Sequence, residues 1–174
     1  MDIPTPTIPN DMSVSSVKHA LSDREAVALT MWGEARGESL AARVAVGMVI
    51  KNRRNHPRRW SNDWRQVCHQ RWQFSCWQKT GGAANHAAVM AWARYYTSID
   101  SRRLQPPSTE RPSVAECLYL ADGVLGGFLL DNTHGSDHYY APRAMVPAGS
   151  APKWAENQTP TAIIDNQRFF RLAV

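Results

Sequence analysis

Residues 31–39 read MWGEARGES, and they follow the apolar run AVAL at 26–29. This order is typical of a buried helix whose last residue, Glu34, opens onto a cleft. A carboxyl group held there against the Trp32 indole can stay protonated at neutral pH and act as an acid. The sequence therefore singles out Glu34 as a candidate catalytic acid.

A second carboxylate, Glu38, follows four residues later. A continuous helix would place Glu34 and Glu38 on one face, but Gly37 favours a helix end between them. Two plainer interpretations stay open. Both carboxylates are solvated charges at a helix end, or Glu38 holds Arg36 or a helix cap.

The chain has 174 residues, 43% of them hydrophobic, which is enough for one domain with a real core. Residues 1–21 contain several Pro, Ser and Thr and are predicted to form an extended N-terminal arm. Residues 22–174 are predicted to form a single domain. The N-terminus lacks the basic start and apolar core of a secretory signal peptide, and no run is long and apolar enough to suggest a membrane span.

Capping residues and helical periodicity predict five helices. Ser22 with Glu25 and Ser113 with Glu116 have capping-box spacing, and Asn85 is a further predicted N-cap. The predicted helices cover 23–34, 40–54 (capped by Ser39), 64–70, 86–98 and 114–125. The segment 71–77 alternates aromatic and polar residues, so a strand and an ordered loop both stay open.

After residue 126 the sequence changes to short aromatic or β-branched runs between turn residues. These runs, at 138–140, 162–164 and 168–170, are predicted strands. The fold class is therefore α+β, mainly helical with a small antiparallel sheet near the C-terminus.

The net charge is +5, and the excess is concentrated between residues 51 and 71. Such a stretch attracts polyanions, which include nucleic acid and anionic cell-wall or outer-membrane surfaces. The cations proposed to make this contact are Arg53, Arg54, Arg58 and Arg59. Basic residues also lie between Trp60, Trp64 and Trp72, so a non-catalytic polyanion-binding protein with stacked bases is a rival interpretation, although no recognised nucleic-acid-binding motif is present.

Cys68, Cys76 and Cys117 are an odd number, which favours reduced thiols and excludes a complete disulfide framework. Pairing of Cys68 with Cys76 stays open. Their spacing from His69 and His86 fits no compact zinc-ligand pair, so neither a metal nor another cofactor is expected.

The order of several motifs along residues 22–171 resembles the SleB-type cell wall hydrolases, a family of spore-cortex-lytic enzymes that also occurs in phage lysins. The motifs that carry this resemblance are WGEARGE at 32–38, VAVGMVIKNR at 44–53, QFS at 73–75, HYYAP at 138–142, PKWA at 152–155 and RFF at 168–170. Two stretches depart from the family pattern: 131–137 has fewer glycines, and 166–167 lacks a common histidine.

The resemblance implies a lysozyme/lytic-transglycosylase-like fold and makes residues 22–174 a single catalytic domain. It implies a peptidoglycan glycosidase in which Glu34 is the catalytic acid/base. The expected reaction cleaves the MurNAc-β-1,4-GlcNAc bond and leaves a 1,6-anhydro-MurNAc end. A hydrolytic muramidase is the alternative, and it needs a second carboxylate, for which the candidates are Glu38, Asp131 and Asp137.

Substrate contacts are expected from residues on both sides of the Glu34 cleft. Because side chains alternate along a strand, only one of Tyr139 and Tyr140 should point into the groove. The full set of expected substrate-binding residues is Gln73, Phe74, Ser75, Thr133, His138, Tyr139, Tyr140 and Glu38.

The resemblance also implies a biological setting. The chain is expected to act as a phage endolysin that is made in the host cytoplasm without a signal peptide and acts on the cell wall from the periplasm. Its expected partners are peptidoglycan glycan strands, and it is expected to be a monomer without an obligate protein partner.

Overall fold

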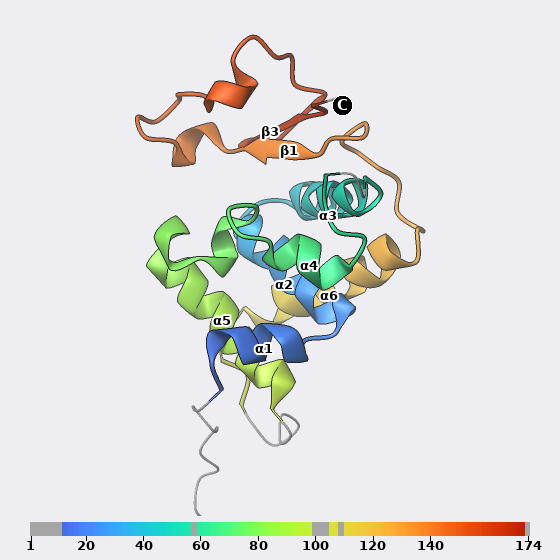
Figure 1. Cartoon of the computed structure of the whole chain (residues 1–174), viewed down its shortest axis with the longest axis vertical. Helices are drawn as coiled ribbons and strands as arrows, with labels where there is room; N and C mark the ends of the chain where they lie inside the picture. Colours follow the sequence, from blue (N-terminus) through green and yellow to red (C-terminus); the bar gives the residue numbers. More distant parts are fainter. Residues whose placement is uncertain (1–11, 57–58, 99–104, 108–109, 173–174) are drawn as a thin grey trace, which may run out of the picture.

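The computed structural model describes residues 12–56, 59–98, 105–107 and 110–172. Within them, helices fill most of the molecule and a small sheet covers one end (Figure 1). The α-helices are α1 (Val14–Ala20), α2 (Asp23–Glu34), α3 (Leu40–Arg54), α4 (Trp64–His69), α5 (Ala83–Thr97) and α6 (Arg111–Leu125). Short 3-10 helices are η1 (Ser75–Trp77), η2 (Lys79–Gly81), η4 (Pro142–Ala144) and η5 (Lys153–Ala155).

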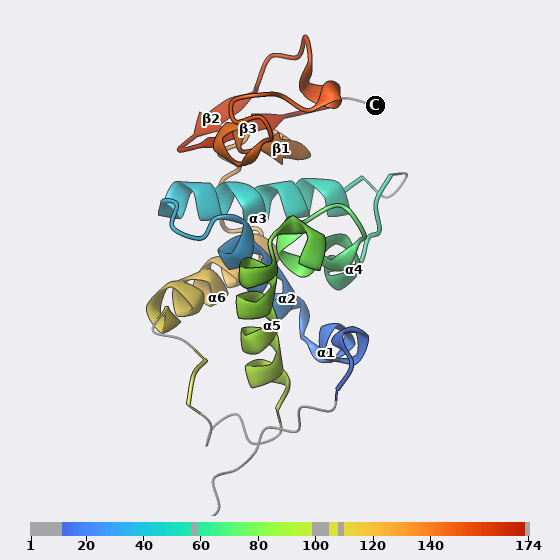
Figure 2. The ribbon, with the colours of Figure 1, turned by 90° about the vertical axis from the view of Figure 1, so that its left-hand side faces the viewer.

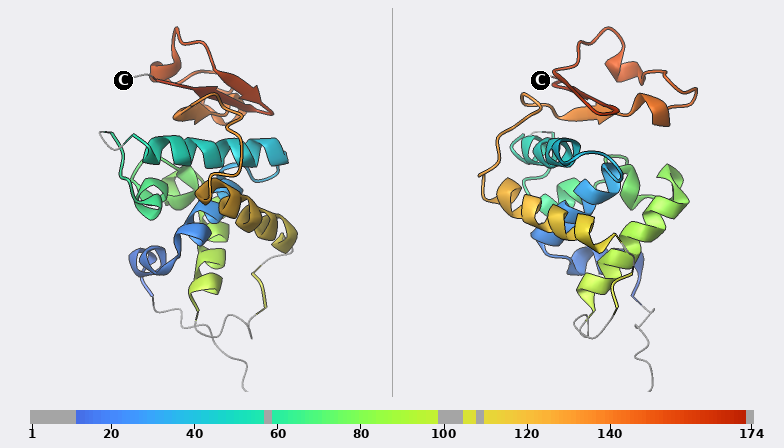
Figure 3. Two further views of the ribbon diagram at one scale, coloured as in Figure 1. Left: turned by 90° about the vertical axis from the view of Figure 1, so that its right-hand side faces the viewer. Right: turned by 180° about the vertical axis from the view of Figure 1, so that it is seen from behind.

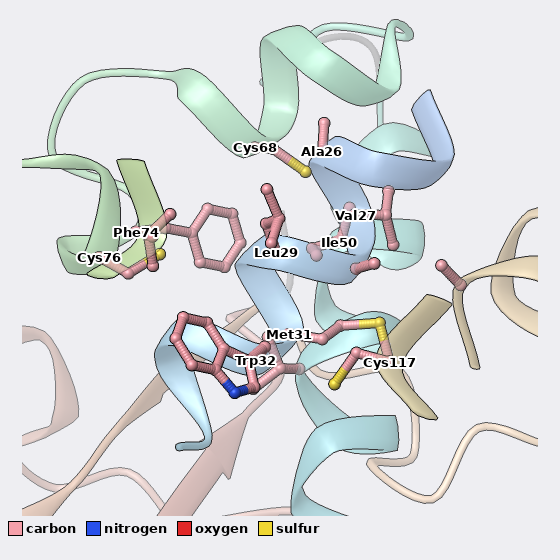
Figure 4. Close-up of a cluster of buried hydrophobic side chains, with 14 of the residues drawn as sticks. Ala26, Val27, Leu29, Met31, Trp32, Ile50, Cys68, Phe74, Cys76 and Cys117 are labelled. Carbon is pink, nitrogen blue, oxygen red and sulfur yellow. The ribbon is translucent and has the colours of Figure 1, made fainter. Parts of the chain in front are cut away.

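Helix α2 is the buried centre of the helical part. It begins with the predicted capping box, in which Ser22 Oγ accepts from the Glu25 N–H and the Glu25 carboxylate accepts from the Ser22 N–H. Residues 26–33 are all buried, because α2 packs against α3, α4, α5 and α6. Leu29 and Trp32 of α2 lie in the same apolar cluster as Phe74 (Figure 4). A helix that is apolar all round needs such neighbours on every side.

The predicted caps of α5 and α6 are wrong. Helix α5 begins at Ala83, and the Asn85 side chain instead donates to the carbonyl oxygen of Gly33 at 2.8 Å. Helix α6 begins at Arg111, and Ser113 Oγ accepts from the Trp32 indole N–H at 3.1 Å. Both polar side chains therefore make tertiary contacts with α2, and Ser113 Oγ also donates to the carbonyl oxygen of Glu110 at 2.8 Å.

The prediction of an extended arm up to residue 21 is also wrong in part. Residues 14–20 form α1, which Ser13 caps through its side chain. Val17 and Leu21 are buried, and α1 packs against α4 and α5. Residues 1–11 lie outside the described part of the chain.

The sheet has the order β1-β3-β2 and is antiparallel throughout. Its strands are β1 (His138–Tyr140), β2 (Ala162–Ile164) and β3 (Gln167–Phe170), as predicted. Helix α3 lies between the sheet and the other helices in all views (Figures 2 and 3). Phe169 of β3 packs against Ala45 and Val49 of α3.

The segment 71–77 contains no strand and ends in η1. The predicted α+β class, mainly helical with a small C-terminal sheet, is confirmed.

The three cysteines are buried free thiols, so Cys68 and Cys76 do not pair. Burial raises the pKa of both Cys68 and Cys117 to about 12. Burial and the neighbouring Glu34 raise the pKa of Cys76 well above its ordinary value.

No helix within the described residues has the length and apolar character needed to span a bilayer.

These thiols predict alkaline instability. The unfolded chain ionises its thiols near pH 9, whereas Cys68 and Cys117 keep their protons until about pH 12 when folded. The contribution of these thiols to the free energy of unfolding should therefore be constant below pH 9 and fall above it, by up to about 1.4 kcal/mol per pH unit for each thiol. Urea unfolding between pH 7 and 11 measures this slope, and Cys117→Ala should reduce it. A slope unchanged in the variant would contradict the prediction, as would rapid reaction of the native thiols with Ellman's reagent at pH 8.

Candidate active site

The Glu34 carboxylate ends α2 and is held by three hydrogen-bond donors. Oε1 accepts from the Cys76 backbone N–H at 2.7 Å and from Ser75 Oγ at 3.1 Å. Oε2 accepts from the Tyr139 hydroxyl at 2.6 Å. Glu34 is half-buried and Ser75 is exposed, so the carboxylate is fixed in direction while one side stays open to solvent.

The end of α2 is fixed by side chains from two other elements. The last carbonyls of a helix have no partner within it. Here Asn85 of α5 donates to the carbonyl oxygen of Gly33, and Gln167 of β3 donates to that of Glu34 at 3.1 Å. The backbone that carries the carboxylate is therefore anchored from the helical part and from the sheet.

Gly33 allows η1 to approach the end of α2. A Cβ atom at this position would lie 2.7 Å from Cβ of Cys76 and 2.8 Å from Cγ2 of Val89. These distances are too short for non-bonded carbon atoms, so only glycine fits without movement. The close approach brings the Cys76 N–H within hydrogen-bonding distance of Glu34.

Tyr139 reaches the site from β1. Its ring stacks on Phe169, with centroids 5.5 Å apart and planes inclined by 29°. The residue as a whole is half-buried, and its hydroxyl is the enclosed part. Burial and the neighbouring Glu34 raise the pKa of Tyr139 well above 10. The hydroxyl therefore stays protonated at any pH near neutrality, and in this structure it donates to the Glu34 carboxylate.

A buried arginine lies behind these groups. Arg53 is 4% exposed, its guanidinium lies 4.8 Å from the ring centroid of Phe74, and its Nε donates to the Asp137 carbonyl oxygen at 2.7 Å. Burial lowers the pKa of Arg53. The nearby Tyr139, Asp137 and Glu34 all act to raise it and so oppose that shift. Because a guanidinium stays charged in proteins, Arg53 supplies a positive charge near the Glu34 carboxylate.

Four of the expected substrate-binding residues face elsewhere. Phe74 is fully buried in the core, and Thr133 is fully buried and donates to the Asp131 carboxylate. Tyr140 packs with Phe170 in a separate cluster. His138 bonds to the Asp137 carboxylate at 2.7 Å. The expectation of substrate contacts from Phe74 and Thr133 is thus wrong, because no surface of either is available. Only Tyr139 of the tyrosine pair reaches Glu34.

Two other expected residues, Gln73 and Glu38, keep some exposed surface. Gln73 is half-buried in the loop before η1. Glu38 is half-buried, and its expected role of holding Arg36 is wrong, because Arg36 pairs with Glu110 at 3.0 Å. Trp32 bonds to Ser113 of α6 and is almost fully buried, so polar donors rather than an indole contact the Glu34 carboxylate.

The expected basic patch differs in part from the structure. Arg53 is buried, and Arg54 is half-buried with its guanidinium 4.6 Å from the Trp64 ring centroid. Arg59 is exposed and lies 5.0 Å from the Trp60 ring centroid. Arg58 lies outside the described residues. The prediction that Arg53 is exposed is wrong, because its methylene groups and its guanidinium are buried.

Several functional groups carried no signal in the sequence. The Cys76 donor is a backbone N–H, which any residue type supplies. The sequence predicts a helix cap for Asn85 and no role for Gln167, yet the two donate to the carbonyl oxygens of Gly33 and Glu34. Within the described residues there is no group of three or more His, Cys, Asp or Glu that could hold a metal ion.

Comparison with solved structures identifies the fold. The chain matches the catalytic domain of the SleB protein of Bacillus cereus with a TM-score of 0.53 and 21% identity, over 95% of this chain and 97% of that one. It matches the catalytic domain of the germination-specific lytic transglycosylase SleB from Bacillus anthracis with a TM-score of 0.53 and 20% identity, over 92% and 98% of the two chains. These structures share the fold. A comparison with curated protein sequences finds no match.

The family follows from the sequence itself. The model of the cell wall hydrolase family matches residues 37–170, which is most of the chain. This protein therefore belongs to the cell wall hydrolase family.

Gly33→Ala tests the close approach of η1. Alanine is favoured over glycine inside a helix by about 1 kcal/mol, but the clash with Cys76 should cost about 1–3 kcal/mol. We expect a net loss of stability in urea unfolding and a larger relative loss of peptidoglycan digestion, because the Cys76 N–H is displaced. Gly47→Ala is the matched control, since its Cβ would lie 2.8 Å from Val124 and 3.1 Å from the flexible side chain of Met31 and would meet neither Cys76 nor Glu34. It should lower stability while the folded protein stays active. Equal activity of the two variants would contradict this account.

Tyr139→Phe removes one donor and keeps the ring. We expect a folded protein that digests peptidoglycan about 10- to 100-fold more slowly, since a hydrogen bond to a charged group is worth about 1.5–3 kcal/mol. Tyr140→Phe is the matched control, because Tyr140 packs in the other cluster. Turbidity loss of purified sacculi measures both. A similar effect of the two substitutions would show that the Tyr139 hydroxyl has no special role.

Proposed function

We propose that this chain is a lytic transglycosylase that cleaves the β-1,4 bond between N-acetylmuramic acid and N-acetylglucosamine in peptidoglycan. The observation that supports this proposal is the Glu34 carboxylate at the end of α2, fixed by three donors and open beside Ser75. The family and the neighbour described as a lytic transglycosylase agree with such a reaction. The family match begins at residue 37, so the role of Glu34 rests on its geometry.

The donors suggest which oxygen carries the reacting proton. The Cys76 N–H can only donate, so Oε1 of Glu34 stays an acceptor. The Tyr139 hydroxyl can donate or accept, so the proton belongs on Oε2. Oε2 gives this proton to the glycosidic oxygen as its bond to the anomeric carbon breaks. The muramoyl 6-hydroxyl then bonds to the anomeric carbon and returns its proton to Oε2, which leaves a 1,6-anhydro ring and consumes no water.

The surroundings of the other carboxylates favour this route over hydrolysis, which needs two carboxylates. Asp131 accepts four hydrogen bonds, from Asn52, Gly135 and both the N–H and the hydroxyl of Thr133. Asp137 accepts from His138 and from the backbone of residue 172. Both carboxylates therefore accept hydrogen bonds that stabilise the surrounding loop. The muramidase alternative would depend on Glu38.

The structure offers little support for the rival polyanion-binding function. Trp60 and Trp64 are less than a tenth exposed, so they present no face on which a base could stack. Of the three tryptophans in the basic stretch, Trp72 alone is largely exposed.

The proposal extends to the biological setting. We infer that the chain acts as a phage endolysin on peptidoglycan glycan strands in the periplasm. The net charge of +5 suits approach to an anionic wall or outer membrane. The exposed Arg59 is a candidate contact in this approach.

The proposed chemistry is tested on purified sacculi. Wild type should release muropeptides that end in 1,6-anhydro-MurNAc, which resist borohydride reduction and are identified by mass spectrometry. Glu34→Gln should fold normally and lose activity by about 10³-fold or more, because it removes the proton donor. Glu156→Gln, which neutralises an exposed carboxylate elsewhere, is the matched control.

Each outcome decides a separate point. Full activity of Glu34→Gln would remove this residue as the acid. Reducible ends from the wild type would replace the transglycosylase with a muramidase. Failure to lyse permeabilised Gram-negative cells, with sacculi still digested, would count against the endolysin role.

A further inference from the structure

A second concave surface lies next to the proposed catalytic site. It is a depression of about 400 Å³ where three segments meet: the α2–α3 connection, η4 and the turn between β2 and β3. The tip of the β2–β3 hairpin lies over the N-terminal end of α3 (Figure 2). The lining residues are Gly37, Glu38, Ser39, Arg143, Asp165 and Asn166.

The depression adjoins Glu34 through the backbone. Glu38 is four residues from Glu34, and its N–H donates to the carbonyl oxygen of Ala35 at 3.1 Å, which keeps this connection short. On the other side, Gln167 follows Asn166 directly and donates to the Glu34 carbonyl oxygen. A ligand anchored at Glu34 is therefore within reach of the depression.

The charges that line the depression have opposite signs and are not paired with each other. In the described part of the chain, neither the Glu38 carboxylate nor the Arg143 guanidinium takes part in a hydrogen bond or ion pair. Asp165 accepts from the Ser39 N–H at 2.8 Å, and hydrogen bonding to Ser39 lowers the pKa of its carboxyl. Asp165 is therefore ionised at neutral pH. A ligand that carries both an ammonium and a carboxylate would complement this arrangement.

The substrate places such a group nearby. In peptidoglycan the stem peptide is attached to the lactyl group of N-acetylmuramic acid, which is the sugar that would react at Glu34. Some stem peptides contain a diamino acid such as meso-diaminopimelate, whose free end carries both an ammonium and a carboxylate. Others contain lysine, whose free end is an ammonium alone. Binding of a part remote from the reacting bond helps to position the reacting sugar.

We propose that this depression binds the stem peptide of the reacting muramic acid and selects a residue with a zwitterionic free end, as in meso-diaminopimelate. Arg143 pairs with the carboxylate, and Glu38 and Asp165 receive the ammonium. The inference rests on the proposed function, because Glu34 anchors the sugar to which the peptide is attached.

The test compares two peptidoglycan substrates that share the glycan strand and differ at the third stem residue, meso-diaminopimelate or lysine. The measured quantity is the ratio of their kcat/KM values. Wild type should prefer the diaminopimelate substrate, and Arg143→Gln should reduce that preference about fivefold, mainly through KM, since ion pairs at exposed sites are of modest strength. Amidation of the diaminopimelate carboxylate should reduce the wild-type preference to the same extent.

Matched variants separate local from general charge effects. Arg59→Gln also removes one exposed positive charge, but beyond the far end of α3, and should keep the wild-type preference. Glu38→Gln should raise KM for both substrates, because both carry the ammonium. Glu156→Gln is its control. An unchanged preference in Arg143→Gln would overturn the proposal.

Direct binding keeps this inference distinguishable from the proposed function. The soluble tripeptide L-Ala-γ-D-Glu-meso-diaminopimelate is titrated into isotope-labelled protein, and backbone amide shifts are followed by NMR. Shifts at Glu38, Ser39 and Asn166 that disappear in Arg143→Gln would support the peptide site even if Glu34→Gln kept full activity. Absence of these shifts would overturn the peptide site even if Glu34 proved essential.

Discussion

The orientation of one carboxylate depends on how the C-terminal end of α2 is held. Glu34 accepts from a backbone N–H of η1 and a hydroxyl of β1, while its own carbonyl oxygen accepts from Gln167 of β3. None of these contacts is possible unless α2 is enclosed by its neighbours and ends close to η1. The absence of a side chain at Gly33 provides that closeness. The packing that encloses α2 therefore also determines the geometry of the site.

A buried residue, Arg53, supplies a positive charge near this carboxylate. Arg53 belongs to a stretch with many cations, yet its side chain is buried and its guanidinium lies over the Phe74 ring. Burial of a guanidinium is costly unless polar groups and charges offset it. The Asp137 carbonyl oxygen and the nearby Glu34 supply that compensation. The nearby Glu34 therefore helps Arg53 remain charged where solvent is limited.

Local signals in the sequence predicted the features that depend on local structure. The Ser22–Glu25 capping box begins α2, and the aromatic and β-branched runs form the three strands. Prediction failed where a polar side chain had a choice of partners. Asn85 and Ser113 have the residue type and spacing of caps but bond to α2 across the fold. Phe74 could not be assigned to core or groove from its type alone, because an aromatic ring serves either.

At the site, sequence patterns identified Glu34, Ser75 and Tyr139, and the structure brings these three together. Strand alternation correctly separated Tyr139 from Tyr140. The Cys76 donor could not be found from the sequence, because its N–H is common to nearly all residues and only its position matters.

The groups around Glu34 come from widely separated parts of the chain, and Gln167 is made last among them. Strand β1 is held in place by β3, which ends at Phe170. A ribosome-bound or prematurely terminated copy that ends before β3 would possess the acidic residue without the parts that aim it. Such a copy would lack Gln167 and the strand that holds Tyr139 in place, so its Glu34 carboxylate would have no fixed direction.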